Sequence, residues 1–482
     1  MGIENWSDEF VNGSIIEAAR CRACAPRPNS QFSSDGTSKR ILLGTLQDVT
    51  TVQFTSVRGR LKAIFVGSIG NLVEWYDFYA YTAFALYFAN SFFPGKNPVV
   101  QQLNAAVLFA IGFIMRPIGG WLFGHLADHY GRRKSLMLSV LLMCFGSLMI
   151  AVTPTSASIG MAAPLVLGLA RLIQGLSLGG EYGSSATYLS EVAGEKDRGF
   201  YVSFHYVTLI GGQLGAIVIL LILQQAFLTP EQMRAWGWRI PFLVGALLAI
   251  TALLMRRNLH ETDAFIEARK VAKRESSVRT MLRYPRQILI VVGLTAGGTT
   301  AFYTYTTYMQ KFLKLTIGLS DNQTTIVSFA SLVFAASLQP IYGAISDRVG
   351  RRPLLIWFGL MGTIFTVPLL RTLQSTKTAL GAFILIALAW LFVAGYTSIN
   401  AVVKAELFPT AVRATGVGLP YAITTSIFGG PTESIALFFK AEGHEAWFFY
   451  YLSSLLAVAF IVALIMRDTK KYSTIGGSAE LN

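Results

Sequence analysis

In the first half of the chain, five charged side chains stand well inside long apolar stretches of the sequence: Glu74, Asp77, Arg116, Arg171 and Glu181. Charge inside an apolar stretch is costly unless it is paired or hydrated, so each of these is a candidate functional residue. An acid beside an arginine could act as a proton switch. The charged carboxylate would hold the guanidinium, and protonation would release it for an anionic ligand, which links proton binding to anion binding.

The spacing of these residues favours an encounter between Asp77 and Arg171. Glu74 and Asp77 lie one helical turn apart on one face, with Tyr81 a further turn along. A rise of about 1.5 Å per residue, counted from the ends of the two apolar stretches, places Asp77 and Arg171 at a similar depth. We expect Asp77 to be the proton carrier, with Glu74 and Glu181 as candidate second carriers. A permanent structural ion pair is the alternative.

The stretches that hold these charges are long enough to cross a membrane. The chain has 482 residues, of which 53% are hydrophobic and 14% charged, whereas soluble chains carry about 25% charged residues. Helices are favoured over strands because the stretches are continuously apolar and lipid requires internal pairing of the backbone. We count twelve stretches, at about 63–90, 102–124, 135–153, 161–189, 202–227, 239–256, 287–312, 324–346, 354–373, 378–404, 414–439 and 445–466.

Lys and Arg gather on one side of this predicted bundle. The connections after the odd-numbered stretches hold few of them, whereas the central loop 257–286 holds more than all of those connections together. The positive-inside rule makes this side cytoplasmic and places both termini there. The topology accounts for the net charge of +14, so a nucleic-acid partner is not needed.

The two ends of the chain differ from the apolar stretches. Residues 1–57 are polar, which is typical of a disordered cytoplasmic tail, and residues 467–482 form a second, short tail. We expect no secretory signal, because the first long apolar stretch lacks a small-residue cleavage site. Cys21 and Cys24 form a CxxC pair without a second pair or a His cluster, so neither a metal nor a cofactor is predicted.

A charged phrase occurs twice, as GHLADHYGRRK at 124–134 and as GAISDRVGRRP at 343–353. Glu191 and Arg198 also have the same separation as Glu406 and Arg413. Two matches at corresponding places predict an internal repeat. We therefore expect an all-α membrane protein of two six-helix halves, at 58–256 and 287–466.

Glycines at a four-residue spacing follow one face of the fourth stretch. They are Gly175, Gly179 and Gly183. Small residues at this spacing let two helices approach closely within a membrane. We expect a neighbouring helix to lie against this smooth edge.

Arg116 breaks the repeat, because the aligned position in the second half is Ala335. A charged residue that is present in one half only suits the binding of an asymmetric ligand better than a role in the symmetric scaffold. A guanidinium can also bind a carboxylate with two parallel hydrogen bonds. The alternative is that Arg116 only neutralises Glu74 or Asp77. Lys311 is a candidate second cation from the other half, although a lysine that snorkels toward the outer interface explains it equally. Candidate neutral donors to the ligand are Gln213, Tyr81, Tyr303 and Tyr308.

The layout resembles the major facilitator superfamily, whose loops after the second and eighth helices carry G-x-x-x-D-x-x-G-R-[RK]. The segments EWYDF, MRPIGG and GGEYG resemble its metabolite:proton symporter family. In combination with WGWRIPFLVGALLA, FYTYTTYMQKFL and SIFGG they look most like the α-ketoglutarate permeases of that family. The resemblance covers about residues 60–466, and related proton-coupled transporters place an acid in the first helix against an arginine in the fourth.

The resemblance implies a gate where the two halves meet at the cytoplasmic mouth. Asp128 and Asp347 would pair there with arginines and with helix ends, and would hold the inside closed until a rocking motion breaks the contacts. The alternative is that arginine-rich turns only set the topology. The predicted gating residues are Asp128, Arg132, Arg133, Glu191, Arg198, Asp347, Arg351, Arg352, Glu406 and Arg413.

The implied function is proton-coupled import of a dicarboxylate, most like α-ketoglutarate, by a monomer in a bacterial inner membrane. Alternatives are another organic acid such as shikimate or citrate, proline or betaine, and an uncoupled uniporter, which has less need of buried acids. An enzyme is not expected, because the five His and three Cys residues lack the spacing of metal ligands or of a catalytic group.

Overall fold

The computed structural model describes residues 57–130, 132–179, 181–257, 277–409 and 412–475. These residues are helical apart from short connections, so the all-α prediction is confirmed for the part of the chain that is described. Most of the predicted tail 1–57 and most of the predicted central loop lie outside the described residues, as does the end of the chain from residue 476.

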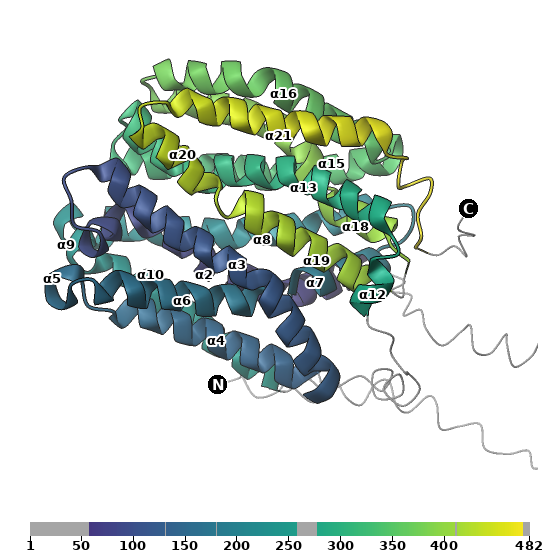
Figure 1. Cartoon of the computed structure of the whole chain (residues 1–482), viewed down its shortest axis with the longest axis horizontal. Helices are drawn as coiled ribbons and strands as arrows, with labels where there is room; N and C mark the ends of the chain where they lie inside the picture. Colours follow the sequence, from purple (N-terminus) through teal and green to yellow (C-terminus); the bar gives the residue numbers. More distant parts are fainter. Residues whose placement is uncertain (1–56, 131, 180, 258–276, 410–411, 476–482) are drawn as a thin grey trace, which may run out of the picture. The chain divides into compact units, whose positions relative to one another are not determined.

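In the first half, each predicted stretch coincides with one helix or with two segments joined end to end. The long helices are α2 (Val57–Phe92), α3 (Pro98–Tyr130), α4 (Arg132–Val152), α6 (Ala162–Leu178) followed by α7 (Glu181–Val192), α8 (Arg198–Ile222) and α10 (Ile240–Arg257). Short helices α5 (Ser156–Ile159) and α9 (Pro230–Ala235) lie in two connections at one end of the bundle, on the left of Figure 1.

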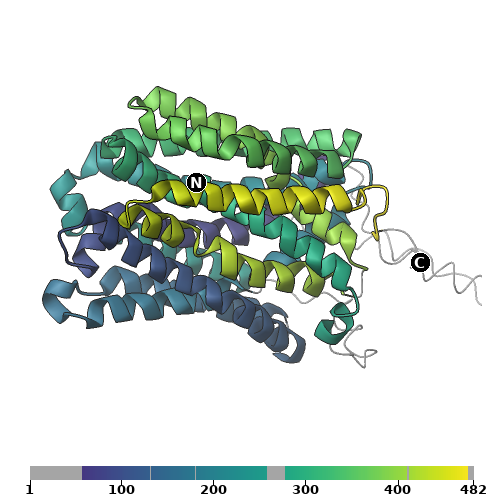
Figure 2. The ribbon, with the colours of Figure 1, turned by 45° about the horizontal axis from the view of Figure 1, so that its top comes forward.

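The second half repeats this pattern after the short helix α12 (Ser277–Met281). Its helices are α13 (Pro285–Tyr303) and α14 (Met309–Phe312), α15 (Asp321–Val349), α16 (Arg352–Ser375), α17 (Ala379–Thr397) and α18 (Asn400–Leu407), α19 (Arg413–Thr424) and α20 (Thr432–Ala441), and α21 (Glu445–Ile465). The long helices of both halves run side by side (Figures 1 and 2). π-Helical turns, which are frequent at functional sites, connect α13 to α14 and α19 to α20.

The helices have the length and surface that a membrane requires. Within the described residues, seven helical segments are long and apolar enough to cross a membrane, and three shorter apolar helices accompany them. Large apolar side chains such as Trp121, Leu165 and Leu289 are exposed on the outside of the bundle. An exposed apolar surface of this kind is suited to lipid.

Glycines bring α6 into backbone contact with α3. A Cβ added at Gly175 would lie 1.8 Å from the carbonyl oxygen of Gly112, and one added at Gly179 would lie 2.0 Å from that of Arg116. The predicted smooth edge is therefore confirmed for Gly175 and Gly179, where any larger residue would push the helices apart, whereas Gly183 faces a different helix, α19. This contact fixes the backbone of Arg116 against α6.

Glycines also let the two halves touch. A Cβ at Gly183 of α7 would lie 2.8 Å from the Cα of Gly418 in α19, and one at Gly343 of α15 would lie 2.6 Å from the carbonyl oxygen of Gly199 in α8. α8 packs along α15 and along α2. These close approaches hold the halves together at the end of the bundle that carries α7, α12 and α18, on the right of Figure 1.

Candidate functional site

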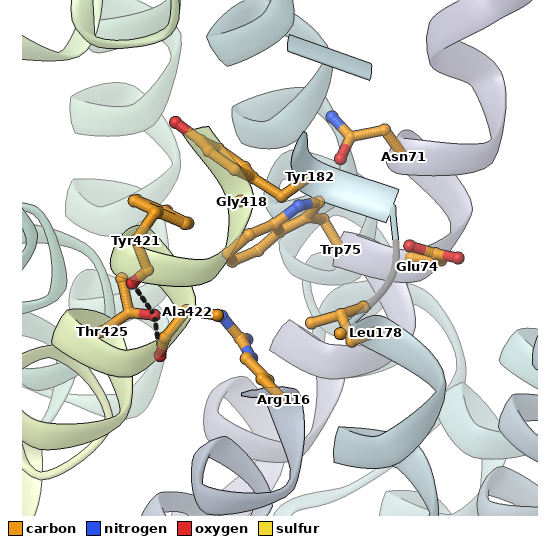
Figure 3. Close-up of a pocket in the computed structure, with 11 residues that line it drawn as sticks. Asn71, Glu74, Trp75, Arg116, Leu178, Tyr182, Gly418, Tyr421, Ala422 and Thr425 are labelled. Carbon is orange, nitrogen blue, oxygen red and sulfur yellow. Dashed lines mark hydrogen bonds between the residues drawn. The ribbon is translucent and has the colours of Figure 1, made fainter. Parts of the chain in front are cut away.

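A cavity of about 20 Å³, roughly the room of one water molecule, lies between the two halves (Figure 3). We call it the central pocket. Helices of both halves line it, with Asn71, Glu74, Trp75, Arg116, Leu178, Gly179 and Tyr182 from the first half and Gly418, Tyr421, Ala422 and Thr425 from the second. The cavity is smaller than any dicarboxylate.

Arg116 extends from α3 into this pocket, toward Trp75 and Ala422 in Figure 3. Its side chain is buried, and its Nε and Nη2 atoms have no hydrogen-bond partner. The guanidinium carbon lies 3.8 Å from the ring centroid of Phe113 and 4.6 Å from that of Phe78. Arg116 therefore rests on aromatic faces with donor atoms left unused.

These aromatic contacts offset only part of the cost of burying the Arg116 charge. A cation–π contact contributes about 0.5–2 kcal/mol, whereas the burial of an ion costs several kcal/mol. Among the ion pairs of the described residues, none joins Arg116 to Glu74 or Asp77. The alternative in which Arg116 only neutralises one of these acids therefore has no support in the observed contacts.

Asp77 and Arg171 lie in one hydrogen-bonded group, but Gln174 stands between them. Arg171 Nη1 donates to Gln174 Oε1 at 2.6 Å, and Gln174 Nε2 donates to Asp77 Oδ2 at 2.6 Å. Ser147 donates to the other carboxylate oxygen of Asp77. We call these four residues the Asp77 network. The direct pair expected from the sequence is replaced by a relay through an amide.

The Asp77 network is sealed from solvent. Asp77 is 1% exposed, and both Arg171 and Gln174 are 0% exposed. The Arg171 guanidinium carbon lies 4.5 Å from the ring centroids of Phe78 and Tyr81. Because Tyr81 donates its hydroxyl to the carbonyl oxygen of Ala105 at 3.0 Å, it contributes a ring face here and its donor is already engaged.

Lys311 is fully buried and paired with an acid that the sequence analysis missed. Its Nζ lies 3.1 Å from a carboxylate oxygen of Glu433 in α20, and it donates to the carbonyl and hydroxyl oxygens of Thr82 in α2 at 2.5 and 2.6 Å. The snorkelling interpretation is therefore wrong, since the ammonium does not reach the surface. Glu433 already neutralises this cation, so Lys311 is a weak candidate for contact with a ligand.

The candidate neutral donors also differ in whether another residue already engages them. Tyr308 donates its hydroxyl to Glu445 at 2.9 Å, and neither residue lines the central pocket. Gln213 and Tyr303 are buried; the Gln213 amide has no hydrogen-bond partner among the described residues, and the Tyr303 hydroxyl lies beside the Arg116 guanidinium. Tyr303 packs edge-on against Phe113, the ring that supports Arg116. Gln213 and Tyr303 therefore remain candidates.

Lys404 of α18 is a second buried cation that the sequence analysis missed. It is 2% exposed, and its Nζ lies 3.8 Å from the ring centroid of Tyr421 and 3.5 Å from the hydroxyl of Tyr182. The rings of Tyr182 and Tyr421, both of which line the central pocket, are stacked with centroids 3.7 Å apart. Asn400 donates to the Tyr182 hydroxyl at 3.0 Å. No ion pair of the described residues includes Lys404.

Several predicted gating residues meet between the halves at the end that carries α7, α12 and α18, which we call the Arg-rich end. Arg413 pairs with Glu191 across the halves at 2.7 Å. Glu406 lies 3.8 Å from Arg198 of the first half and 3.4 Å from Arg351 of the second. These ion pairs connect α7 and α8 to the second half.

Asp347 connects the halves through a helix end. Its two carboxylate oxygens accept the backbone N–H groups of Gly199 and Phe200 at 2.8 Å each, in the first turn of α8. It also pairs with Arg351 at 2.8 Å. An acid at a helix N-terminus is favoured by the helix dipole and satisfies otherwise unpaired N–H groups.

Other predicted gating and coupling residues do not join the halves or cannot be placed. Arg352 donates to the carbonyl oxygens of Leu464 and Ala463 at 2.6 and 3.2 Å, within the second half. The side chains of Asp128, Arg132, Arg133 and Glu181 lie outside the described part of the structure.

The segment after α21 covers the Arg-rich end, which the sequence did not indicate. Thr469 donates to Glu406 at 2.6 Å, and Asp468 accepts the backbone N–H groups of Arg351 and Arg352 at 3.2 and 3.3 Å. Lys470 donates to the carbonyl oxygen of Asp347. This segment therefore contacts several of the residues that connect the halves.

The chain resembles known transporters over most of its length. The family model "Sugar (and other) transporter" matches residues 63–283 and 260–475. The chain is 50% identical over 417 residues to the alpha-ketoglutarate permease of Escherichia coli K12, covering 86% of this chain and 96% of that protein. It is 32% identical over 424 residues to the citrate-proton symporter of Salmonella typhi, covering 87% and 97%, and 30% identical over 447 residues to the proline/betaine transporter of Escherichia coli K12, covering 89% and 87%.

Solved structures show the same fold. The crystal structure of a D-xylose-proton symporter superimposes with a TM-score of 0.68 at 19% identity, covering 86% of this chain and 99% of that one. A major facilitator superfamily proton:xylose symporter bound to 6-bromo-6-deoxy-D-glucose gives a TM-score of 0.67 at 17% identity, covering 86% and 97%. The helices, the family model and the curated relatives agree: the chain belongs to the Sugar (and other) transporter family, and it has the fold of these major facilitator superfamily symporters.

Proposed function

We propose that this protein is a secondary transporter that imports α-ketoglutarate together with protons. The observation that carries the proposal is Arg116, a buried guanidinium with unused donor atoms at a pocket lined by both halves. The identity of 50% with an alpha-ketoglutarate permease supports this choice of substrate over the other organic acids.

Charge counting supports a dicarboxylate at this pocket. A carboxylate that enters a low-dielectric cavity needs a charged or hydrogen-bonding partner, because its loss of hydration is otherwise too costly. Arg116 can offer two parallel N–H groups to one carboxylate. In this structure the pocket is too small for such a ligand, so the halves must separate to admit it.

The Asp77 network offers a route for coupling to protons. Charged Asp77 accepts from both Ser147 and Gln174, and Gln174 in turn holds Arg171. Protonation would remove the charge that strengthens these hydrogen bonds, so Gln174 and Arg171 would be held less firmly. We infer that the proton acts on Arg171 through Gln174.

Alternating access would require that the contacts between the halves can open at either end of the bundle. In this structure the Arg-rich end is joined by ion pairs, and the opposite end is joined by hydrogen bonds from Thr82 to Glu433 at 2.9 Å and from Tyr79 to the carbonyl oxygen of Thr306 at 2.7 Å. We propose that rocking of the halves opens one end at a time. By the positive-inside rule the Arg-rich end would face the cytoplasm of a bacterial inner membrane, together with both termini.

This mechanism needs a small organic acid, protons and a lipid bilayer. The residues proposed for the ligand and for the proton lie within one chain, so a monomer suffices. No bond of the substrate is broken, and the protein would therefore be a transporter without enzymatic activity and without a cofactor.

A counterflow assay with purified protein in liposomes tests the substrate. The vesicles would be loaded with α-ketoglutarate, citrate, shikimate, proline or betaine, and the entry of labelled α-ketoglutarate would be measured. We expect α-ketoglutarate to give the strongest exchange. Uptake driven by an inward proton gradient should accumulate substrate and should collapse with a protonophore. Exchange without accumulation would show a uniporter, and stronger exchange with another compound would reassign the substrate.

A further inference from the structure

We propose that Lys404 is the second cation of the substrate site and binds the distal carboxylate of the dicarboxylate, while Arg116 binds the carboxylate beside the keto group. This inference rests on the proposed function. It adds a residue of the second half to a site whose arginine comes from the first half, and it explains why the substrate would be a dicarboxylate.

Lys404 is buried beside the pocket and has no acidic partner. It is 2% exposed, and its ammonium lies over the ring of Tyr421 at 3.8 Å and near the hydroxyl of Tyr182 at 3.5 Å. Both tyrosines line the central pocket. The ammonium therefore contacts two residues that line the cavity into which Arg116 extends.

Lys311 shows what a structural lysine looks like in this protein. Its ammonium is 0% exposed and has a carboxylate at 3.1 Å together with two oxygens of Thr82. Lys404 is equally buried and has one long contact to a hydroxyl. Because burying an ammonium is costly unless an anion or several hydrogen bonds accompany it, the surroundings of Lys404 are suited to a ligand that brings the anion.

The two cations belong to different halves. Arg116 lies in α3, and Lys404 lies in α18. A dicarboxylate held at one end by each would connect the halves and favour the closed state, whereas a monocarboxylate would hold one half alone. Specificity for two carboxylates would therefore arise from closure as well as from binding.

The test compares two ligands that differ in one carboxylate. Affinities for α-ketoglutarate and for 2-oxopentanoate, which lacks the distal carboxylate, would be measured by calorimetry on the purified full chain. We expect Lys404→Gln to weaken the binding of α-ketoglutarate by about tenfold or more, the value of a charge-assisted hydrogen bond. The affinity for 2-oxopentanoate should stay unchanged. The ratio of the two affinities should therefore fall toward unity.

Three further variants make the result decisive. Lys404→Arg keeps the charge and should keep most of the ratio, and Lys404→Met gives a second neutral variant in case Lys404→Gln does not fold. Lys314→Gln is the matched control, because Lys314 pairs with Asp321 in an outer connection away from the pocket and its loss should change neither affinity.

Two results would overturn the inference while leaving the proposed function intact. Either unchanged affinities for both ligands in folded Lys404→Gln and Lys404→Met, or an equal loss of affinity for both ligands, would show that Lys404 does not bind the distal carboxylate. A wild-type protein that binds neither ligand would contradict the proposed function itself.

Discussion

Arg116 and Arg171 are two buried arginines that both rest on aromatic rings and share Phe78, yet within the described part of the chain only Arg171 is connected to an acid. Their guanidinium carbons lie 4.6 and 4.5 Å from the ring centroid of Phe78. Arg171 is connected to Asp77 through Gln174, whereas Arg116 has no acidic partner among the described residues. Packing alone therefore does not assign their roles. The presence or absence of an acid separates a cation in a proton network from a cation that can receive a ligand.

Two lysines repeat this difference. Lys311 is held by Glu433 and Thr82, and Lys404 rests on Tyr421 without an acid. In these two comparisons, the cations linked to an acid lie in the Asp77 network and at the end opposite the Arg-rich end, and the cations without an acid lie beside the central pocket. The comparison predicts that substitutions of the two classes have different consequences.

The largest expected effect is on stability at Lys311. Lys311→Met leaves the Glu433 carboxylate buried without its partner, which should cost about 3–5 kcal/mol of unfolding free energy. Lys404→Met leaves no buried charge behind and should be neutral or stabilising. Thermal unfolding of the purified variants in detergent would measure both. The double variant Lys311→Met with Glu433→Gln should recover much of the loss, and equal unfolding temperatures for the two single variants would contradict the distinction.

The next effect is on binding at Arg116. Arg116→Lys keeps the charge but loses the planar pair of donors. It should therefore weaken the binding of α-ketoglutarate by about 1–3 kcal/mol, the range for a charge-assisted hydrogen bond. Arg116→Ala should weaken it further. Calorimetry on folded proteins is the measurement. If both variants bind like the wild type, Arg116 is a packing residue and Arg171 becomes the better candidate for the ligand.

Much of the fold follows from the sequence for one physical reason. Lipid forces a continuously apolar stretch into a helix, so the apolar stretches and the helices coincide closely. The glycine edge was also predictable, because Gly175 and Gly179 allow a backbone contact that larger residues would block. The functional candidates Asp77, Arg116 and Arg171 could be recognised because charge is rare in such stretches.

The partners of these charges could not be predicted in the same way. The amide of Gln174 lies between Asp77 and Arg171 because of its side-chain conformation, which residue spacing does not determine. Glu433 and Lys404 were visible as charges within or at the end of apolar stretches, but their contacts involve residues distant in the chain. The same holds for Thr469 on Glu406, since the segment after α21 contains no motif that indicates where it lies.

The smallest expected effect concerns access to the pocket. Asp347→Asn weakens the charge at the N-terminus of α8, a loss of about 0.3–1 kcal/mol, and should shift the protein toward opening at the Arg-rich end. A cysteine at Ala422, which lines the pocket, would report this by aqueous labelling in a background without Cys21, Cys24 and Cys144. We expect faster labelling than with Asp347 intact. An unchanged rate at normal expression would remove Asp347 from the gate.

We assign Arg171, which is connected to Asp77, to proton coupling and Arg116, which has no acidic partner among the described residues, to ligand binding. Transport by Asp77→Asn is the most direct test of this assignment. Asparagine resembles the protonated acid, so Gln174 and Arg171 would stay in the weakly held state at every pH, while Arg116 and the pocket remain as they are. Liposomes containing this variant should exchange labelled α-ketoglutarate for unlabelled α-ketoglutarate, but should no longer accumulate it when a proton gradient is imposed. Accumulation at the wild-type level would show that Asp77 is not the proton carrier and would contradict the account.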